Sequence, residues 1–198
     1  MHYAQRLLAA LPSTRLGARA ILAVLTAFGI ILTTAGVAAM PLLNEGNAVE
    51  VEAEVLGVEE MIEVGAVRLA VRNRTEDDLA EMRRCVEHYA VADRTDDVQA
   101  LVGIDYAFHD VILRTAGNQF VSSAVHPYRD ALLGARFRAT ESSEVRSRVD
   151  AQHREILEAV EKQDEDRAVS LMQAHMAQTR EDILAARERR DDEVSENL

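Results

Sequence analysis

The sequence lacks the residues that build several classes of protein. It has no tryptophan, four tyrosines, four phenylalanines and one cysteine among 198 residues. A single cysteine cannot form an internal disulfide, so a disulfide-stabilised secreted scaffold is excluded and the reducing cytoplasm is the expected compartment. Three prolines and nine glycines are too few for a collagen-like or low-complexity chain. A hydrophobic content of 48% favours a folded, mainly helical protein instead.

Positive charge is also scarce, and it is unevenly placed. The chain holds 22 Lys and Arg against 34 Asp and Glu, which gives a net charge of −12. Phosphate contacts need a basic surface, so this balance argues against nucleic-acid binding by the chain as a whole. Residues 1–48 nevertheless carry Arg6, Arg15 and Arg19 against Glu45 alone. Two segments of different character therefore meet near residue 48.

One long segment, from Ala20 to Asn44, contains no charged residue. It is long enough to span a bilayer, and the arginines before it fit a membrane anchor or a signal peptide. The alternative is a helix that ends at Gly29, then a β-branched strand over 30–34 and a second apolar strand after a turn at 35–36. Periodicity alone leaves both interpretations open.

After residue 49 the pattern is helical throughout. Apolar residues recur at helical spacing, cap residues and acids open the segments, and short polar connections separate them. The expected helices run from 51 to 73, from a cap at Thr75 through Val86, from a cap at 95–97 to 115, from 120 to 137, from 145 to 162, and from a cap at Asp164 through Ile183. The charged tail, residues 187–198, is expected to fray. Six helices with short connections predict an antiparallel bundle.

Three histidines fall where a helix would turn them inward. Asp105 and His109 are four residues apart and share a helix face, while His153 and His175 lie on the apolar sides of two later helices. One carboxylate and three imidazoles suit a divalent ion such as Zn²⁺. The alternative is that each histidine is an ordinary core residue. Asp150, three residues before His153, is a rival ligand or a partner that orients that ring.

Motifs of catalysis are missing from the sequence. It contains no G-x-S-x-G elbow, no glycine loop that could cradle a phosphate, no H-E-x-x-H and no paired E-x-x-H. We therefore do not expect an enzyme.

Taken together, the residues from about 50 to 186 resemble the C-terminal FCD domain of FadR-type regulators in the GntR family. The resemblance rests on a first-helix signature, Ile62-Glu63 through Leu69-Ala70 with the cap at 75–79. Four further motifs follow in the family's order and approximate spacing: Asp105-x-x-Phe108-His109, Ala116-Gly117-Asn118, His153 to Val160, and Ala168 with Met172-x-x-His175-Met176. It implies a mostly α fold, a six- to seven-helix antiparallel FCD bundle. It also implies that Asp105, His109, His153 and His175 bind a divalent metal, zinc before nickel, manganese or iron, with a small organic acid on or beside it.

The resemblance also indicates where that acid, the effector, would be recognised. Asn118 and Glu59 are the candidate effector contacts. The family usually has an arginine at the position of Glu59, so we expect altered or weakened recognition of the acid here. Four protein ligands around an ion that accepts five or six leave positions for water or a carboxylate.

The resemblance also suggests another interpretation of the charge-free segment, because members of this family carry an N-terminal winged helix-turn-helix. Residues 18–31 resemble its recognition helix and residues 33–39 its wing. We therefore divide the chain into a partial winged helix-turn-helix (a helix plus a β-hairpin wing) over 1–48, an FCD domain over 49–186 and the charged tail. This DNA-binding region, residues 1–48, is shorter than the family's winged helix-turn-helix and carries fewer charges. Arg15 and Arg19 are left as its candidate DNA contacts.

These features predict a cytoplasmic, homodimeric transcriptional regulator that responds to a small carboxylate at a metal-containing helical pocket and does not enter a membrane. Its binding to operator DNA is expected to be impaired. Two other classes stay open at this point. One is a metalloenzyme or metal-dependent binding protein that uses the bundle alone, and the other is a helical protein anchored in a membrane by residues 20–43.

Overall fold

The part of the chain that the structure describes is helical from end to end. The computed structural model describes residues 45–196, and the chain divides into two compact units, Met1–Ala48 and Val49–Leu198. Within the described residues there are six helices and no strand: α3 (Glu45–Asn73), α4 (Glu76–Arg94), α5 (Val98–Thr115), α6 (Gln119–Thr140), α7 (Ser143–Glu161) and α8 (Glu165–Glu196). The expected wing and both candidate DNA contacts, Arg15 and Arg19, lie outside these residues.

Side-chain caps begin the helices where the sequence predicts. At α4 the hydroxyl of Thr75 accepts from the backbone N–H of Asp78, and the Asp78 carboxylate accepts from the N–H of Thr75 at 2.9 Å, which completes a capping box. At α5 the carboxylate of Asp97 accepts from the N–H of Ala100 at 2.9 Å. Caps of the same kind precede α6, α7 and α8, at Asn118, Ser142 and Asp164. Each cap satisfies backbone donors that the first turn of a helix leaves unpaired.

The turn between α5 and α6 requires a glycine. Gly117 has a φ of +76°, in the region that residues with a side chain rarely adopt. A Cβ atom there would also lie 3.2 Å from the side-chain nitrogen of Asn73, which donates to the carbonyl of Ala116 at 3.0 Å. The glycine thus lets the end of α3 close against the end of α5.

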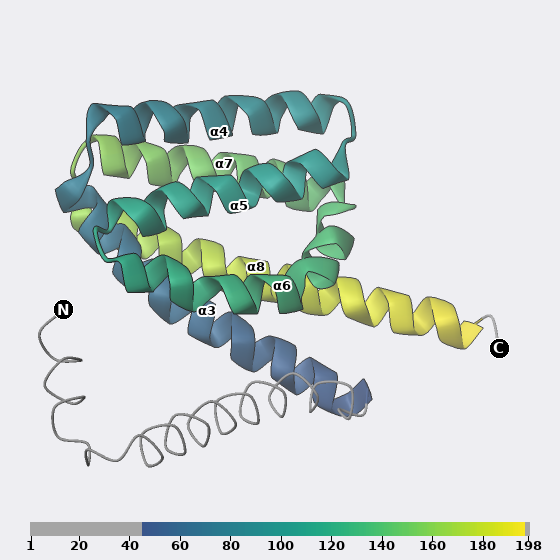
Figure 1. Ribbon diagram of the computed structural model, residues 1–198. Helices are drawn as coiled ribbons and strands as arrows, with labels where there is room; N and C mark the ends of the chain where they lie inside the picture. Colours follow the sequence, from purple (N-terminus) through teal and green to yellow (C-terminus); the bar gives the residue numbers. More distant parts are fainter. Residues whose placement is uncertain (1–44, 197–198) are drawn as a thin grey trace, which may run out of the picture. The chain divides into compact units, whose positions relative to one another are not determined.

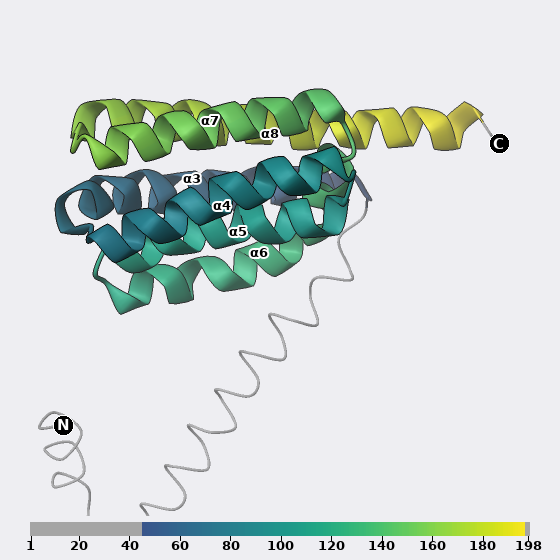
Figure 2. The same cartoon turned by 90° about the horizontal axis from the view of Figure 1, so that it is seen from above.

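Five of the helices form a closed ring. α4 packs against α5, α5 against α6, α6 against α8, α8 against α7, and α7 against α4. Figure 1 shows that helices consecutive in the chain from α4 to α8 run in opposite directions, while α6 and α8, which also pack together, run in the same direction. In Figure 2 α7 and α8 lie together along one side. The prediction of an antiparallel bundle is confirmed.

Three apolar clusters fill the bundle, and α3 contributes buried residues to two of them. Ala66, Val67, Ala70 and Val71 of α3 join the larger cluster, whose most deeply buried side chains include Phe108. Leu56 of α3 joins the smaller cluster with residues of α6 and α8. Between these positions α3 buries two acids, Glu59 and Glu63. A polar region therefore lies inside the bundle between two hydrophobic ones.

The last helix extends beyond the expected end of the domain. We expected residues 187–198 to fray, but α8 continues to Glu196. Arg187 is 7% exposed, and its guanidinium lies 3.2 Å from the carboxylate of Glu52 on α3. This cross-helix partner gives the last part of α8 a contact that a pattern of charges in one segment does not reveal.

The described helices also bear on the membrane alternative. None of them contains a stretch both long and apolar enough to cross a bilayer. The charge-free segment from Ala20 to Asn44, which raised that alternative, is outside the described residues.

Candidate metal centre

The four predicted ligands come together inside the ring of helices. Asp105 and His109 lie on α5, His153 on α7 and His175 on α8, and one ligand atom from each lies within 4.8 Å of the others. The three histidines are buried, and the side chain of Asp105 is 13% exposed. A group of this composition could hold a metal ion.

The four side chains face a common centre. Nε2 of His109 lies 3.2 Å from Nε2 of His175, and Nε2 of His153 lies 3.5 Å from Oδ1 of Asp105. The ring centroids of the three histidines are 4.9 to 5.4 Å apart. Three imidazole nitrogens and one carboxylate oxygen are therefore arranged as the donors of a single ion would be.

Neighbouring side chains hold two of the rings from behind. Nδ1 of His175 lies 2.8 Å from Oε1 of Gln152, and Nδ1 of His109 lies 3.2 Å from Oε2 of Glu63. An acceptor at Nδ1 keeps the proton there and leaves the lone pair of Nε2 free toward the centre. His153 is held differently, because Phe108 stacks on its ring at 4.1 Å between centroids.

The sequence reasoning did not identify Glu63 or Gln152. A signal for Glu63 was present, because Glu59 and Glu63 follow Leu56 and precede Val67 at the spacing of the buried face of α3. An acid in register with an apolar stripe indicates a buried partner. Gln152, directly before His153, has no comparable signal.

Burial and charge set the protonation of the three rings. Burial lowers the pKa of His153 and of His175 well below the ordinary value, and the neighbouring histidines lower both further. Burial also acts to lower the pKa of His109, but the charge of Glu63 outweighs it and leaves that pKa raised. Neutral imidazoles at 153 and 175 offer the lone pairs that a metal needs.

The nitrogen that His153 would offer to a metal has no hydrogen-bond partner. Nε2 of His153 is buried and accepts or donates no hydrogen bond in the structure. A buried polar atom without a partner costs free energy of about 1–3 kcal/mol. A bound divalent ion would satisfy this atom, so the residues present fit a metal.

Buried ion pairs surround the cluster on the side of α3 and α6. The guanidinium of Arg136 donates to Glu59 at 2.7 Å and to Oδ2 of Asp105 at 3.3 Å. Arg129, seven residues earlier on α6, donates to Glu63 at 3.4 Å and also to Asp110. Because a buried charge without a partner is strongly destabilising, these pairs must form together.

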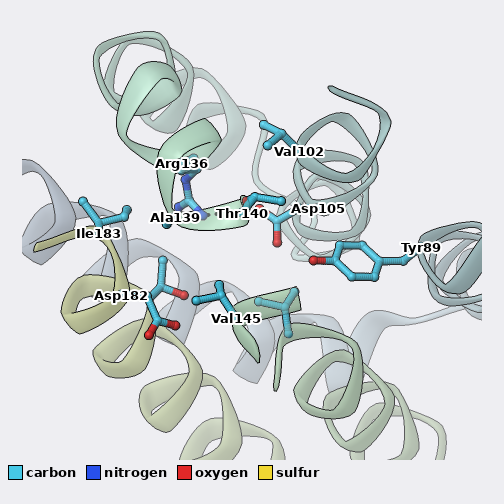
Figure 3. A pocket seen from close by; sticks show the side chains of 11 residues that line it. Tyr89, Val102, Asp105, Arg136, Ala139, Thr140, Val145, Asp182 and Ile183 are labelled. Atoms are coloured by element: carbon cyan, nitrogen blue, oxygen red, sulfur yellow. Dashed lines mark hydrogen bonds and ion pairs between the residues drawn. The ribbon is translucent and has the colours of Figure 1, made fainter. Parts of the chain in front are cut away.

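A small cavity adjoins the cluster. Asp105, Arg136, Tyr89 and Thr140 are among its lining residues, and its volume is about 30 Å³. Figure 3 shows the guanidinium of Arg136, the carboxylate of Asp105 and the hydroxyl of Tyr89 around the same space. A cavity of this size holds about two water molecules.

The structure places the remaining predicted site residues in different surroundings. Glu59 is buried beside the cluster through its pair with Arg136. Asn118 is exposed at the start of α6, where its side chain accepts from the N–H of Phe120 at 3.0 Å, and it borders a separate open groove between α3 and α6. Asp150 pairs with Arg154 on the surface of α7 at 2.9 Å. The structure therefore does not bring Asn118 or Asp150 to the four ligands.

Comparison with known proteins places these observations in context. The family model of the FCD domain matches residues 54–178. The fold is similar to Escherichia coli McbR/YncC (18% identity, 74% of this chain and 71% of that one, TM-score 0.63) and to a Streptococcus agalactiae GntR protein (17% identity, TM-score 0.59). The latter match covers 72% of this chain but 63% of the streptococcal one. No curated protein matches the sequence.

Proposed function

Because the chain belongs to the FCD domain family of GntR-type regulators, we propose that it is a transcriptional regulator that responds to a small organic acid at a metal-containing pocket. The observation that carries the proposal is the buried group of Asp105, His109, His153 and His175, whose ligand atoms lie within 4.8 Å of one another. The unpartnered nitrogen of His153 supports it further.

The donor set favours zinc. Three neutral imidazoles and a carboxylate suit Zn²⁺, while nickel, manganese and iron accept the same ligands. When bound, the metal would supply a positive charge and open coordination positions for an anion. His109, His153, His175 and Asp105 would hold it, and Glu63 and Gln152 would orient two of the rings.

A buried cation explains how an acid could bind inside a helical bundle. Transfer of a carboxylate from water into an apolar interior is strongly unfavourable without a compensating charge. The cavity beside Asp105 is lined by one of the four predicted ligands. We therefore propose that the effector binds there, with its carboxylate toward the metal.

The response would pass through α3. This helix precedes the rest of the domain in the chain, and its Glu59 and Glu63 contact Arg136 and His109 at the centre of the bundle. A ligand that changes these contacts changes how α3 is held, and a two-state regulator needs such a differential contact. In this proposal residues 1–48 are the DNA-binding head, residues 49–186 the sensor, and two chains act as a cytoplasmic homodimer.

Metal analysis tests the first part of the proposal. The purified wild-type chain should hold about one divalent ion, and His153→Ala should lower the metal affinity about 10-fold or more because one of four ligands is lost. His88→Ala, which removes an exposed histidine, is the matched control and should leave the metal content unchanged. Unaltered metal content in alanine variants of all four ligands would refute the site.

Thermal unfolding tests the response to acids. Small carboxylates should raise the Tm of the metal-loaded chain and have no effect after chelation. Mass action predicts a stabilisation of about 2.7 kcal/mol when the acid is at a hundredfold excess over its Kd. Equal shifts with and without chelator would show that the metal takes no part in binding the acid.

A further inference from the structure

A buried arginine, which is not one of the predicted metal ligands, lines the cavity beside Asp105. Arg136 is 7% exposed, and its guanidinium lines this cavity. Its two terminal nitrogens reach Glu59 and Asp105, but its Nε is buried and has no hydrogen-bond partner. In Figure 3 the guanidinium faces the space that the Tyr89 hydroxyl and the Asp105 carboxylate also border. A donor is thus available next to the proposed metal position.

The distances place Arg136 one carboxylate away from the metal centre. Oδ1 of Asp105 lies 3.5 Å from Nε2 of His153, among the ligands, whereas Oδ2 lies 3.3 Å from Nη1 of Arg136. An anion that enters the cavity therefore meets the guanidinium and the metal centre on the two sides of Asp105. Arginine suits this task because its planar fork matches a carboxylate.

The buried charges indicate what kind of anion fits. Around the metal centre they are three carboxylates and two guanidiniums, those of Glu59, Glu63, Arg129, Arg136 and the nearly buried Asp105. Together they carry one net negative charge, which a divalent metal changes to one net positive charge. Asp110, which pairs with Arg129, keeps 41% of its side chain exposed, so water offsets its charge. One monoanion balances the loaded site, and a dianion leaves an excess of negative charge in the interior.

The size of the cavity points to the same class of ligand. Its volume of about 30 Å³ corresponds to about two water molecules, the space of a carboxylate with one or two further atoms. Val145 and Ile183 line it as well, so there is an apolar surface for a short carbon chain.

We propose that Arg136 is the residue that binds the carboxylate of the effector and that the effector is a small monocarboxylic acid. This inference rests on the proposed function, because it requires a metal at the four ligands. The family usually has an arginine on α3 at the position of Glu59, and in this chain we assign recognition of the acid to Arg136 on α6 instead. Glu59 has a supporting role, because it holds the guanidinium in place from α3.

The test compares two arginines of the same helix. Arg129 and Arg136 both contact Glu59, and both guanidiniums lie over the ring of Tyr106, at 5.1 and 5.3 Å. Only Arg136 is among the residues that line the cavity described above. Arg129→Gln therefore removes the same charge without removing the proposed contact.

The measurement is the Tm of the zinc-loaded full chain with acetate, propionate or succinate, followed by zinc analysis of each sample. Acetate and propionate should stabilise the wild type more than succinate does. Arg136→Gln should weaken their binding about 10- to 100-fold, the effect of one charge-assisted hydrogen bond. Arg129→Gln removes the same charge but not the contact, so it should weaken their binding less than Arg136→Gln does. Arg136→Lys keeps the charge but not the fork, and it should bind more weakly even if Arg136→Gln does not fold.

Several results would overturn the inference. They are equal losses in both glutamine variants, wild-type affinity in Arg136→Gln or in Arg136→Lys, and a larger response to succinate than to propionate. In each case a zinc-loaded chain that still responds to acids leaves the proposed function intact. A wild-type chain that holds no metal refutes the proposed function itself, and this inference with it.

Discussion

Single residues behind the ligands determine how well the centre can bind a metal. Glu63 lies against Nδ1 of His109, and Gln152 against Nδ1 of His175, so each fixes the face that its ring presents. Glu63 has a second task, because Arg129 donates to its other oxygen at 3.4 Å. A residue that orients a ligand in this way contributes to metal affinity without touching the metal.

Glu63→Gln should lower the affinity for zinc about 10-fold, because the neutral amide polarises the His109 ring less than a carboxylate does. The matched control is Glu60→Gln. Glu60 is the neighbouring acid on α3, and it pairs with Arg180 at 2.8 Å at a half-exposed position without contacting a histidine. Competition with a chromophoric chelator measures both affinities. An equal loss in the two variants would attribute the effect to the charge of α3 rather than to His109.

At the scale of the elements, α3 is attached to the bundle by two kinds of contact. Its second half packs through small apolar residues, and its first half pairs with arginines of α6 and α8 through Glu52, Glu59 and Glu60. Ion pairs exchange partners more readily than an apolar core repacks, because the core is close-packed. In the proposed regulator, the first half of α3, which is nearest in sequence to residues 1–44, is therefore the half whose attachment a bound ligand would alter.

The start of α4 gives a prediction at the same scale. Thr75→Ala removes the hydroxyl of the capping box and should lower the free energy of unfolding by about 1 kcal/mol. Thr75→Ser keeps the hydroxyl and should stay close to the wild type. Denaturant unfolding followed by circular dichroism measures the difference. An alanine variant as stable as the serine variant would show that the cap does not contribute.

For the whole molecule, charge is the property that bears most on the proposed binding to DNA. The chain carries −12, and the candidate DNA contacts predicted from the sequence are Arg15 and Arg19. Specific binding needs phosphate contacts that set the register and side chains that reach the bases. A negative sensor domain adds repulsion instead of steering, most strongly at low salt.

We therefore expect operator affinity at least ~100-fold weaker than the 10⁻⁸ to 10⁻¹¹ M that is typical of specific regulators. Fluorescence titration of DNA selected from random sequence, at near-physiological salt, measures it. Zinc analysis of the same sample shows that the sensor is intact, and Arg19→Ala shows whether any remaining binding uses the predicted contact. Nanomolar, sequence-specific binding by the wild-type chain would contradict the prediction.

The sequence alone determined the local features of this protein. Helix starts such as Thr75 and Asp97 could be predicted because a cap and its backbone partner are neighbours in the chain. The pairing of Asp105 with His109 follows from helix geometry in the same way. His153 and His175 were assigned as ligands by the resemblance to the family, because spacing within one helix does not show which helices face each other.

Only the tertiary structure decided the surroundings of the centre. Glu63 contacts His109, and Arg136 contacts Glu59, across 46 and 77 positions of the chain, so no local pattern links them. The positions of Asn118 and Asp150 in the sequence were compatible with a role at the site. In the structure, however, Asn118 caps the start of α6 and Asp150 pairs with Arg154 on the surface of α7. The physical reason is that a sequence pattern gives the face on which a residue lies, whereas a site is made where the faces of distant helices meet.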